Sequence, residues 1–138
     1  MGNDLTSDML TRIRNAVSIK QNFVNVLPCK LNLEILKIFE TEGYIKNFEL
    51  ILSAKNKKLI RVNLKYKGWW IKKALFSKVV RVSKPGQRMF SNYEDFSKKV
   101  SLLKSSKGLA IISTSSGIMS HKKAIHLKKG GEIICYIG

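Results

Sequence analysis

The sequence is poor in acidic residues, cysteine and proline, and it has no long apolar run. Its 138 residues include 9 Asp and Glu against 26 Lys and Arg, with only 2 Cys and 2 Pro. No stretch approaches the roughly 20 apolar residues that a membrane helix needs. The formal net charge of +17 favours a nucleic acid or an anionic membrane, rather than an acidic small molecule, as the partner.

The residue types that build enzymes and metal sites are scarce and scattered. Cys29 and Cys135 lie far apart without a CxxC or His cluster, so we expect two buried thiols in a reducing compartment. Ser115 with His121 or His126 suggests a hydrolase, but the G-x-S-x-G elbow is absent, and no carboxylate pair supports acid–base chemistry. We therefore expect no catalysis, no cofactor, no metal and no small-molecule substrate.

The first half of the chain has the patterns of a small folded unit. Hydrophobic residues make up 44% of the sequence and alternate with the positive charges, which argues against a disordered basic tail. Helical spacing predicts helices over about residues 4–18 and 31–42, the first capped by Asn3 or Asp4 and the second ended by Gly43. We predict strands over residues 23–26, 48–53 and 59–66, and in the last of these apolar and polar residues alternate.

The second half begins at Gly68-Trp69-Trp70, which we take as the boundary between units 1–67 and 68–138. We predict an extended segment over residues 74–82, a short helix within 92–100, and strands at 109–112 and 132–137. A basic helix of about 119–128 is expected to precede the last strand. The predicted fold class is therefore α+β, with two small α/β units packed into one compact body, the second mostly β with short helices.

Two segments of the second half carry the chemistry of a polyanion-binding site. Ser113 to Gly117 forms a hydroxyl-rich strand-to-helix turn, which would offer Oγ atoms and helix-terminal N–H groups to a phosphate. The alternative is an ordinary cap, in which Ser115 or Ser116 only satisfies helix N–H groups. The second segment is a tight turn at Pro85-Gly86 that holds Lys84 and Arg88 on its flanks, with Phe90 nearby for stacking on bases. Its alternative is a solvated basic turn.

Four segments, in order along the chain, resemble the signatures of one family. They are Asp8 to Asn15, Arg81 to Arg88, Ile112 to Met119 and Gly130 to Tyr136, with a weaker match at Glu42 to Ile45. Together they resemble the eighth protein of the bacterial-type small ribosomal subunit. The sequence departs from that family at Phe90, where Tyr is usual, and in the run from His121 to Ile125, where Asp/Asn-Arg-x-Ala-Arg is usual.

The resemblance implies a structural constituent of the small ribosomal subunit that supports subunit assembly and translation. The C-terminal unit would hold a central-domain rRNA helix and the N-terminal unit would make a second rRNA contact, with neighbouring ribosomal proteins that include the fifth-protein family. Glu132 would accept hydrogen bonds from a base or ribose, or orient a neighbouring Lys. The rRNA-binding residues expected on these grounds are Ser113, Thr114, Ser115, Gly117, Lys84, Arg88, Phe90, Gly130, Gly131, Glu132, Arg12, Arg14, Lys122 and Lys123.

Three further points concern Trp69-Trp70, a membrane and the compartment. The Trp pair is open to two interpretations, packing or protein contact on the one hand and stacking on RNA bases on the other. Met1 to Thr6 fits a loose myristoylation pattern, but Gly2 leads directly into a helix, so we expect no membrane partner. The N-terminus lacks a signal or transit peptide pattern, and frequent Lys, Asn and Ile suit an A+T-rich organellar genome. We therefore expect a mitochondrial ribosome, with a plastid or bacterial cytoplasm as alternatives.

Overall fold

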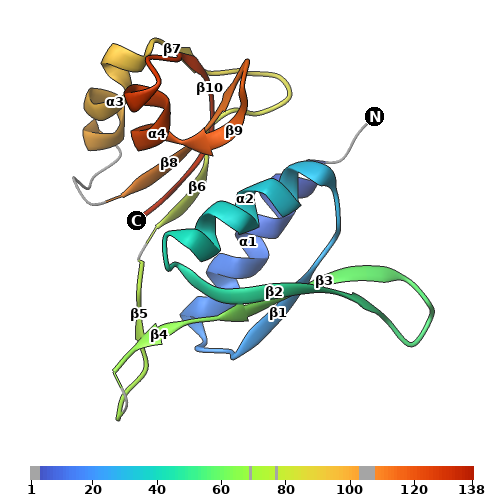
Figure 1. The fold of residues 1–138 in the computed structure, drawn as a ribbon. Helices are drawn as coiled ribbons and strands as arrows, with labels where there is room; N and C mark the ends of the chain where they lie inside the picture. Colours follow the sequence, from blue (N-terminus) through green and yellow to red (C-terminus); the bar gives the residue numbers. More distant parts are fainter. Residues whose placement is uncertain (1–3, 69, 77, 103–107) are drawn as a thin grey trace. The chain divides into compact units, whose positions relative to one another are not determined.

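The computed structural model describes residues 4–68, 70–76, 78–102 and 108–138. Contacts within the chain divide it into an N-terminal unit, Met1–Phe76, and a C-terminal unit, Ser77–Gly138. Each unit combines helices with antiparallel strands (Figure 1), so the predicted α+β class is confirmed. In the described part of the chain, no helix is long and apolar enough to cross a membrane.

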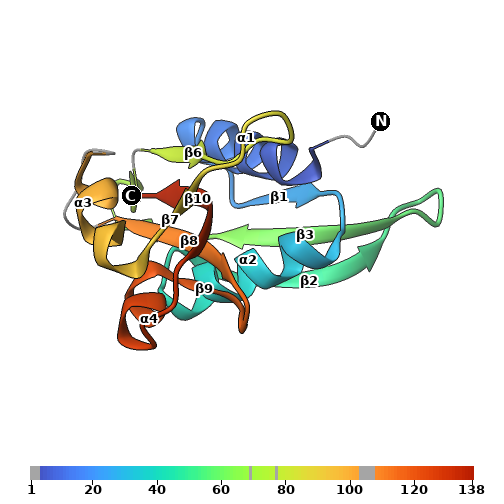
Figure 2. The same cartoon turned by 90° about the horizontal axis from the view of Figure 1, so that it is seen from above.

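The N-terminal unit places two helices on one face of a three-stranded sheet (Figures 1 and 2). The helices are α1 (Leu5–Ser18) and α2 (Lys30–Thr41), and the strands are β1 (Phe23–Val26), β2 (Ile45–Leu52) and β3 (Lys58–Leu64) in the order β1-β3-β2. These elements lie close to their predicted ranges.

The predicted helix ends are confirmed. The Asp4 carboxylate caps α1 by accepting the Ser7 N–H at 3.1 Å. Gly43, with φ of +82°, ends α2 in the left-handed conformation that glycine adopts without strain. The spacing of the buried residues in α1 and β3 also agrees with the prediction. In β3, every second residue is buried. The buried hydrophobic residues of α1 and β3 are Met9, Leu10, Ile13, Ala16, Val17, Ile60, Val62 and Leu64.

The boundary between the units lies after Phe76, beyond the predicted break at Gly68-Trp69-Trp70. Two short strands, β4 (Tyr66–Lys67) and β5 (Lys73–Ala74), form a hairpin that directly follows β3. Phe76 is buried and packs edge-on against Tyr44, with ring centroids 6.1 Å apart. The segment that follows the predicted break therefore belongs to the first unit. Trp69 lies outside the described residues.

The C-terminal unit is built on a sheet with the strand order β6-β10-β8-β9, and β7 pairs with β10 as well. The strands are β6 (Val79–Arg81), β7 (Phe90–Ser91), β8 (Leu109–Thr114), β9 (Gly117–Ser120) and β10 (Gly131–Ile137). The helices are a 3-10 turn at Tyr93–Asp95, α3 (Phe96–Leu102) and α4 (His121–His126). The predicted short helix and two strands are present. Of the predicted extended segment over residues 74–82, Val79–Arg81 forms β6 and Ala74 ends β5, while Ser77 lies outside the described residues.

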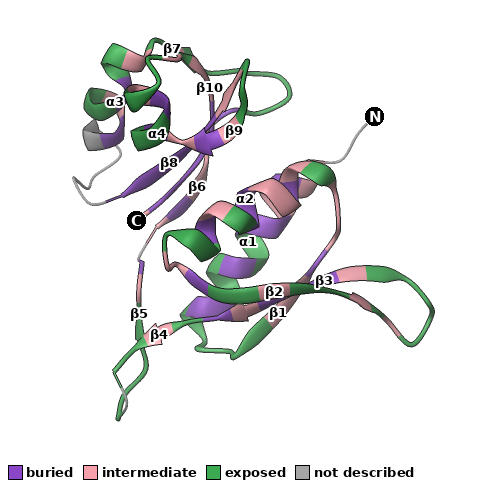
Figure 3. Cartoon of the chain, viewed as in Figure 1, coloured by how far each residue is buried: buried purple, intermediate pink, exposed green. Residues whose placement is uncertain are grey.

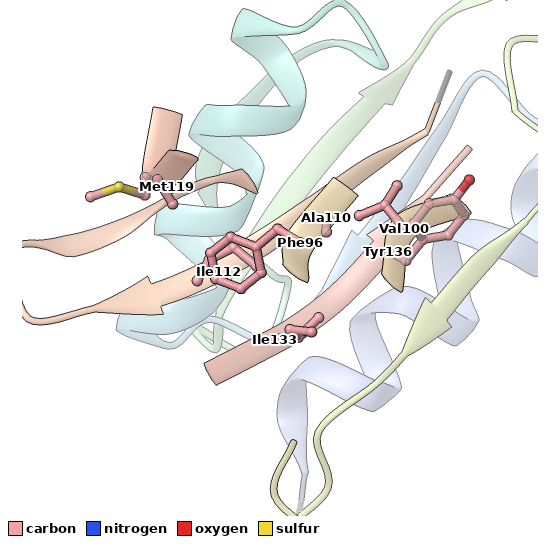
Figure 4. Packing of buried hydrophobic residues seen from close by; sticks show 8 residues of the cluster. Phe96, Val100, Ala110, Ile112, Met119, Ile133 and Tyr136 are labelled. Atoms are coloured by element: carbon pink, nitrogen blue, oxygen red, sulfur yellow. The ribbon is translucent and has the colours of Figure 1, made fainter. Parts of the chain in front are cut away.

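Two helices cover one face of this sheet and enclose the core of the unit. Strand β8 is buried over its first four residues and β10 over its last five (Figure 3). Figure 4 shows how the core side chains gather between sheet and helices. The cluster consists of Phe96, Val100, Ala110, Ile112, Met119, Ala124, Ile133 and Tyr136.

One predicted element was wrong. The hydroxyl-rich segment does not lead from a strand into a helix, because β8 and β9 form an antiparallel hairpin with Thr114 opposite Gly117. Helix α4 begins only at His121, and its cap is Ser120, whose Oγ accepts the Lys123 N–H at 3.2 Å. Met119, expected in the helix, is buried in the core from β9. Burial of the Met119 side chain in this core favours a strand over a helix for this segment.

Candidate RNA-binding surface

Three of the predicted residues form one row across neighbouring strands. Glu132 on β10 lies directly opposite Ser113 on β8 and directly opposite Phe90 on β7. Directly paired residues of antiparallel strands project from the same face of a sheet. The next residues along, Ile112 and Ile133, belong to the core beneath the helices. Since side chains alternate along a strand, the row projects from the face opposite α3 and α4.

The carboxylate of this row is paired with an arginine from the basic turn. Arg88 Nη1 donates to Glu132 Oε2 across 3.1 Å. The Arg88 side chain is 51% exposed and that of Glu132 is 15% exposed, so the pair adds at most about 1 kcal/mol to stability. Its main effect is to hold both groups in place. Glu132 was expected to accept hydrogen bonds from RNA or to orient a neighbouring lysine. In the structure the neighbouring cation is Arg88 and not a lysine, and the RNA contact remains a prediction.

The basic turn has the predicted tight geometry. The backbone groups of Lys84 and Gln87 exchange two hydrogen bonds, at 3.0 and 2.9 Å, which places Pro85 and Gly86 at the tip. Ser83 is fully buried, and its Oγ accepts the Met89 N–H at 2.8 Å. These contacts tie the two arms of the turn together. They leave the side chains of Lys84, Arg88 and Phe90 exposed on its flanks.

The hydroxyl groups of the β8–β9 turn have two different roles. Thr114 Oγ1 accepts the Ser116 N–H at 3.1 Å and donates to the Gly117 carbonyl at 2.9 Å, so this hydroxyl shapes the turn itself. The side chains of Ser113 and Ser115 make no hydrogen bond within the described residues, and both are available to a partner. Gly117 has φ of +113°, and a Cβ there would meet no atom within 4 Å. The backbone at the turn is therefore open to close approach.

Gly130 and Gly131, at the start of β10, are required by strand packing. A Cβ on Gly131 would lie 2.1 Å from the Ser113 carbonyl oxygen, and one on Gly130 would lie 2.7 Å from that of Ser91. These glycines do not end helix α4, which is ended earlier, by Lys128. Lys128 has φ of +56°, and its N–H donates to the Ile125 carbonyl.

Helix α4 presents lysines on its exposed side. Lys122 and Lys123 are exposed, while Ala124 is fully buried in the core. His121 is also buried, and its Nδ1 accepts the Ala110 N–H at 3.1 Å. His121, which replaces the family's usual acidic or amide residue, thus links α4 to β8 instead of facing a partner.

The two predicted arginines of the N-terminal unit lie on the exposed side of α1. Arg12 Nε donates to Asp8 Oδ2 at 2.8 Å, and its Nη1 donates to the Asn25 carbonyl at 3.3 Å. Arg14 is exposed and faces away from the apolar stripe, as predicted. Arg12 is therefore already held in position, partly by an acidic neighbour.

A shallow pocket beside the row includes residues that the sequence analysis missed. Its volume is about 440 Å³, and it is lined by the predicted residues Phe90, Gly130 and Gly131 together with Ser91, Asn92, Asp95 and Lys99. Lys99 Nζ donates to the Phe90 carbonyl at 3.4 Å. The only signal of these additional residues in the sequence is the Lys98-Lys99 pair, which is also typical of any solvated helix. In the described residues, no group of three or more His, Cys, Asp or Glu side chains is arranged to hold a metal ion.

The sequence matches known proteins along nearly its whole length. The model of the family described as "Ribosomal protein S8" matches residues 4–137. The chain belongs to the ribosomal protein S8 family. It is 46% identical over 137 residues to small ribosomal subunit protein uS8c of Phaeodactylum tricornutum, covering 99% of both chains. It is 40% identical over 134 residues to uS8 of Thermodesulfovibrio yellowstonii, covering 97% of both.

Membership of the S8 family confirms the resemblance found in the sequence. The protein is a structural component of the small ribosomal subunit and not an enzyme. These similar proteins are plastid and bacterial. A third, uS8 of Synechocystis, is 42% identical over 134 residues, covering 97% of this chain and 96% of the relative. They give no support to the expected mitochondrial location and favour its plastid or bacterial alternative.

Proposed function

We propose that the C-terminal unit binds a central-domain helix of the small-subunit rRNA through the face that carries Ser113, Glu132 and Phe90. The observation that carries this proposal is the row itself. Three residues from separate parts of the sequence are in direct register on β8, β10 and β7, on the side of the sheet away from its helices. Phe90 is 65% exposed at the end of this row, which core packing alone does not explain.

The side chains of this surface suit different groups of an RNA helix. Lys84, Arg88, Lys122 and Lys123 supply positive charge for phosphates, which positions the RNA without reading its sequence. The short hydroxyls of Ser113 and Ser115 reach only groups close to the backbone, such as a 2′-OH in one geometry. Glu132 repels phosphate and selects a base amino group or a ribose hydroxyl. Phe90 offers a ring to an unstacked base.

The charge distribution supports RNA as the partner over a long part of the chain. Residues 50–93 contain 12 Lys and Arg and no Asp or Glu. Six of the nine acidic residues occur before residue 50. An uninterrupted positive segment attracts polyphosphate from a distance and neutralises it on contact.

Three further proposals concern the N-terminal unit, a neighbouring protein and the location. Arg12 and Arg14 on α1 would make the second rRNA contact, from the N-terminal unit, and a protein of the fifth-protein family would be a neighbour in the subunit. A plastid ribosome is the proposed location, because the relatives at 45–46% identity are plastid proteins. A mitochondrial ribosome is the alternative, which only the composition favours.

Crosslinking within isolated small subunits tests the main assignment. A photoreactive group placed at Ser115 through Ser115→Cys should attach to one helix of the central domain, identified by sequencing the RNA. The matched control is Ser97→Cys on α3, which should give a different pattern because Ser97 lies on a helix over the other face of the sheet. Attachment of the Ser115 probe only to protein, or to RNA outside the central domain, would contradict the proposal.

A further inference from the structure

The β4–β5 hairpin belongs to the N-terminal unit and is not part of the rRNA-binding surface proposed for the C-terminal unit. Tyr66 pairs with Ala74 and Lys67 pairs with Lys73, and Gly68 begins the turn with φ of +82°. A Cβ on Gly68 would lie 2.7 Å from the Ile71 carbonyl oxygen, so the turn closes tightly on the glycine. The backbone at Gly68 thus lies close against the backbone of Ile71.

The base of the hairpin is attached to the loop between α1 and β1. The Tyr66 hydroxyl donates to the Gln21 carbonyl, and the Lys72 ammonium donates to Asn22 Oδ1. Lys72 Nζ also lies 5.3 Å from the centre of the Tyr66 ring. These contacts hold the hairpin on the N-terminal unit, so its turn is presented from a supported base.

The turn exposes large apolar side chains. Trp70 is 82% exposed and Ile71 is 65% exposed. The core-packing explanation of Trp70 is therefore excluded. Two large apolar side chains exposed at neighbouring positions of a hairpin turn favour contact with a partner.

The charge around Trp70 indicates what that partner is. Lys67 and Lys73 lie directly opposite each other across the hairpin, and like charges in that position destabilise a strand pair. An anion bound between them would remove this repulsion. Both lysines lie in the segment from residue 50 to 93 that has no acidic side chain. Trp70 lies in the turn between these two lysines, and neither lysine has an ion pair among the described residues. Aromatic rings and lysines together bind single-stranded nucleic acid, by stacking on bases and contacting phosphates.

We propose that Trp70 stacks on an unpaired nucleotide of the rRNA while Lys67 and Lys73 bind the phosphates beside that nucleotide. This inference rests on rRNA being the partner of the protein, but it concerns a different site from the one on the C-terminal unit. A base that stacks on Trp70 must be unpaired, because bases within a duplex already stack on each other.

Tryptophan fluorescence tests the proposal directly, since the only two Trp residues of the chain are Trp69 and Trp70. In full-length Trp69→Phe protein, all Trp emission comes from Trp70. Titration with an oligoadenylate of about eight nucleotides should quench this emission, whereas an RNA duplex at equal phosphate concentration should quench it much less. Absence of quenching by the single strand, in low salt, would overturn the proposal.

Matched substitutions distinguish base stacking from nonspecific apolar contact. Trp70→Leu keeps the apolar character but removes the ring, and should weaken oligoadenylate binding by roughly five- to a hundred-fold. Trp70→Phe should lose less, and Ile71→Ala should lose least. Circular dichroism should be unchanged because Trp70 is on the surface. Equal affinity of Trp70→Leu and the parent protein would show that no base stacks there.

Two further measurements distinguish other partners and the other site. Vesicles of anionic phospholipid that shift Trp70 emission to the blue, without quenching by oligoadenylate, would indicate a membrane instead. Binding of the central-domain rRNA helix should be nearly the same for Trp70→Leu and the parent. If the parent does not bind that helix but its Trp70 is quenched by oligoadenylate, the C-terminal assignment fails and the Trp70 site stands.

Discussion

Arg88 donates a hydrogen bond to Glu132 across 3.1 Å and thereby links the basic turn to the strand at the centre of the proposed rRNA surface. The two residues are 44 positions apart in the sequence. The pair gives the carboxylate a partner in the free protein, and leaves Glu132 Oε1 without a hydrogen bond among the described residues. A carboxylate oxygen in that position can accept from a base amino group or a ribose hydroxyl.

Glu132→Gln should therefore weaken specific binding without unfolding the protein. The amide keeps the shape but removes the charge that holds Arg88 and strengthens accepted hydrogen bonds. We expect a loss of about 1–2 kcal/mol for the central-domain helix, measured by filter binding, and little loss for an unrelated duplex. Glu94→Gln is the matched control, because it removes the same charge from an exposed position of the same unit. Equal effects of the two substitutions would show that only net charge matters.

The adjacent hydroxyls of Thr114 and Ser115 in the β8–β9 turn should differ in their effects on stability and on RNA binding. Thr114→Ala removes two hydrogen bonds within the turn and should lower the free energy of unfolding by about 1 kcal/mol. Ser115→Ala removes no bond within the described residues and should leave stability unchanged while weakening the cognate helix by about 1 kcal/mol. Urea unfolding and filter binding of both variants provide the test. If Ser115→Ala binds like the parent, its hydroxyl does not contact RNA.

Helices α1 and α2 and strand β3 could be predicted because their burial has a regular period. Ile60, Val62 and Leu64 alternate with polar residues, and the spacing of the α1 core residues matches one helix face. The Pro85-Gly86 turn could also be predicted, since proline fixes φ and glycine allows the tight bend. These features depend on residues that are close together in the sequence.

The β8–β9 hairpin could not be predicted in the same way. Ser113 to Ser116 are small hydroxylated residues that suit a helix cap and a hairpin turn equally well, and β9 has only four residues. Burial of Met119 and the pairing of Ser113 with Ile118 decide between the two, and both are tertiary contacts. The Arg88–Glu132 pair and the pocket beside Phe90 depend on strand register, which no local pattern specifies.

The lysines of α4 should contribute charge without specificity. Lys122→Ala and Lys123→Ala together should weaken the central-domain helix and an unrelated duplex by similar factors. With about 5 to 8 phosphates contacted, the logarithm of the binding constant should fall by several units per decade of salt, and the double variant should reduce this slope by one to two. Filter binding over a range of salt concentrations measures both. A parent slope near zero would rule out phosphate neutralisation as the source of affinity.

Cys135 should make stability depend on pH in the alkaline range. Burial raises the pKa of its thiol from 9.0 to about 12, against a smaller lowering by the Arg81 guanidinium. Between these two values the unfolded thiol has lost its proton while the folded thiol keeps it. The folded state thus binds more protons there, so this contribution is complete below about pH 9 and is lost as pH rises towards 12. The loss approaches about 1.4 kcal/mol for each pH unit.

Cys135→Ala isolates this contribution from the lysines and tyrosines that titrate in the same range. The variant should be less stable than the parent near neutral pH because it leaves a small cavity. The stability difference should shrink, as measured by urea unfolding, from about pH 9 upwards, since only the parent must keep a buried thiol protonated. Cys29→Ala is the control for the loss of a thiol that is only half-buried. A constant difference for Cys135→Ala up to about pH 11 would mean that the folded thiol ionises as easily as the unfolded one.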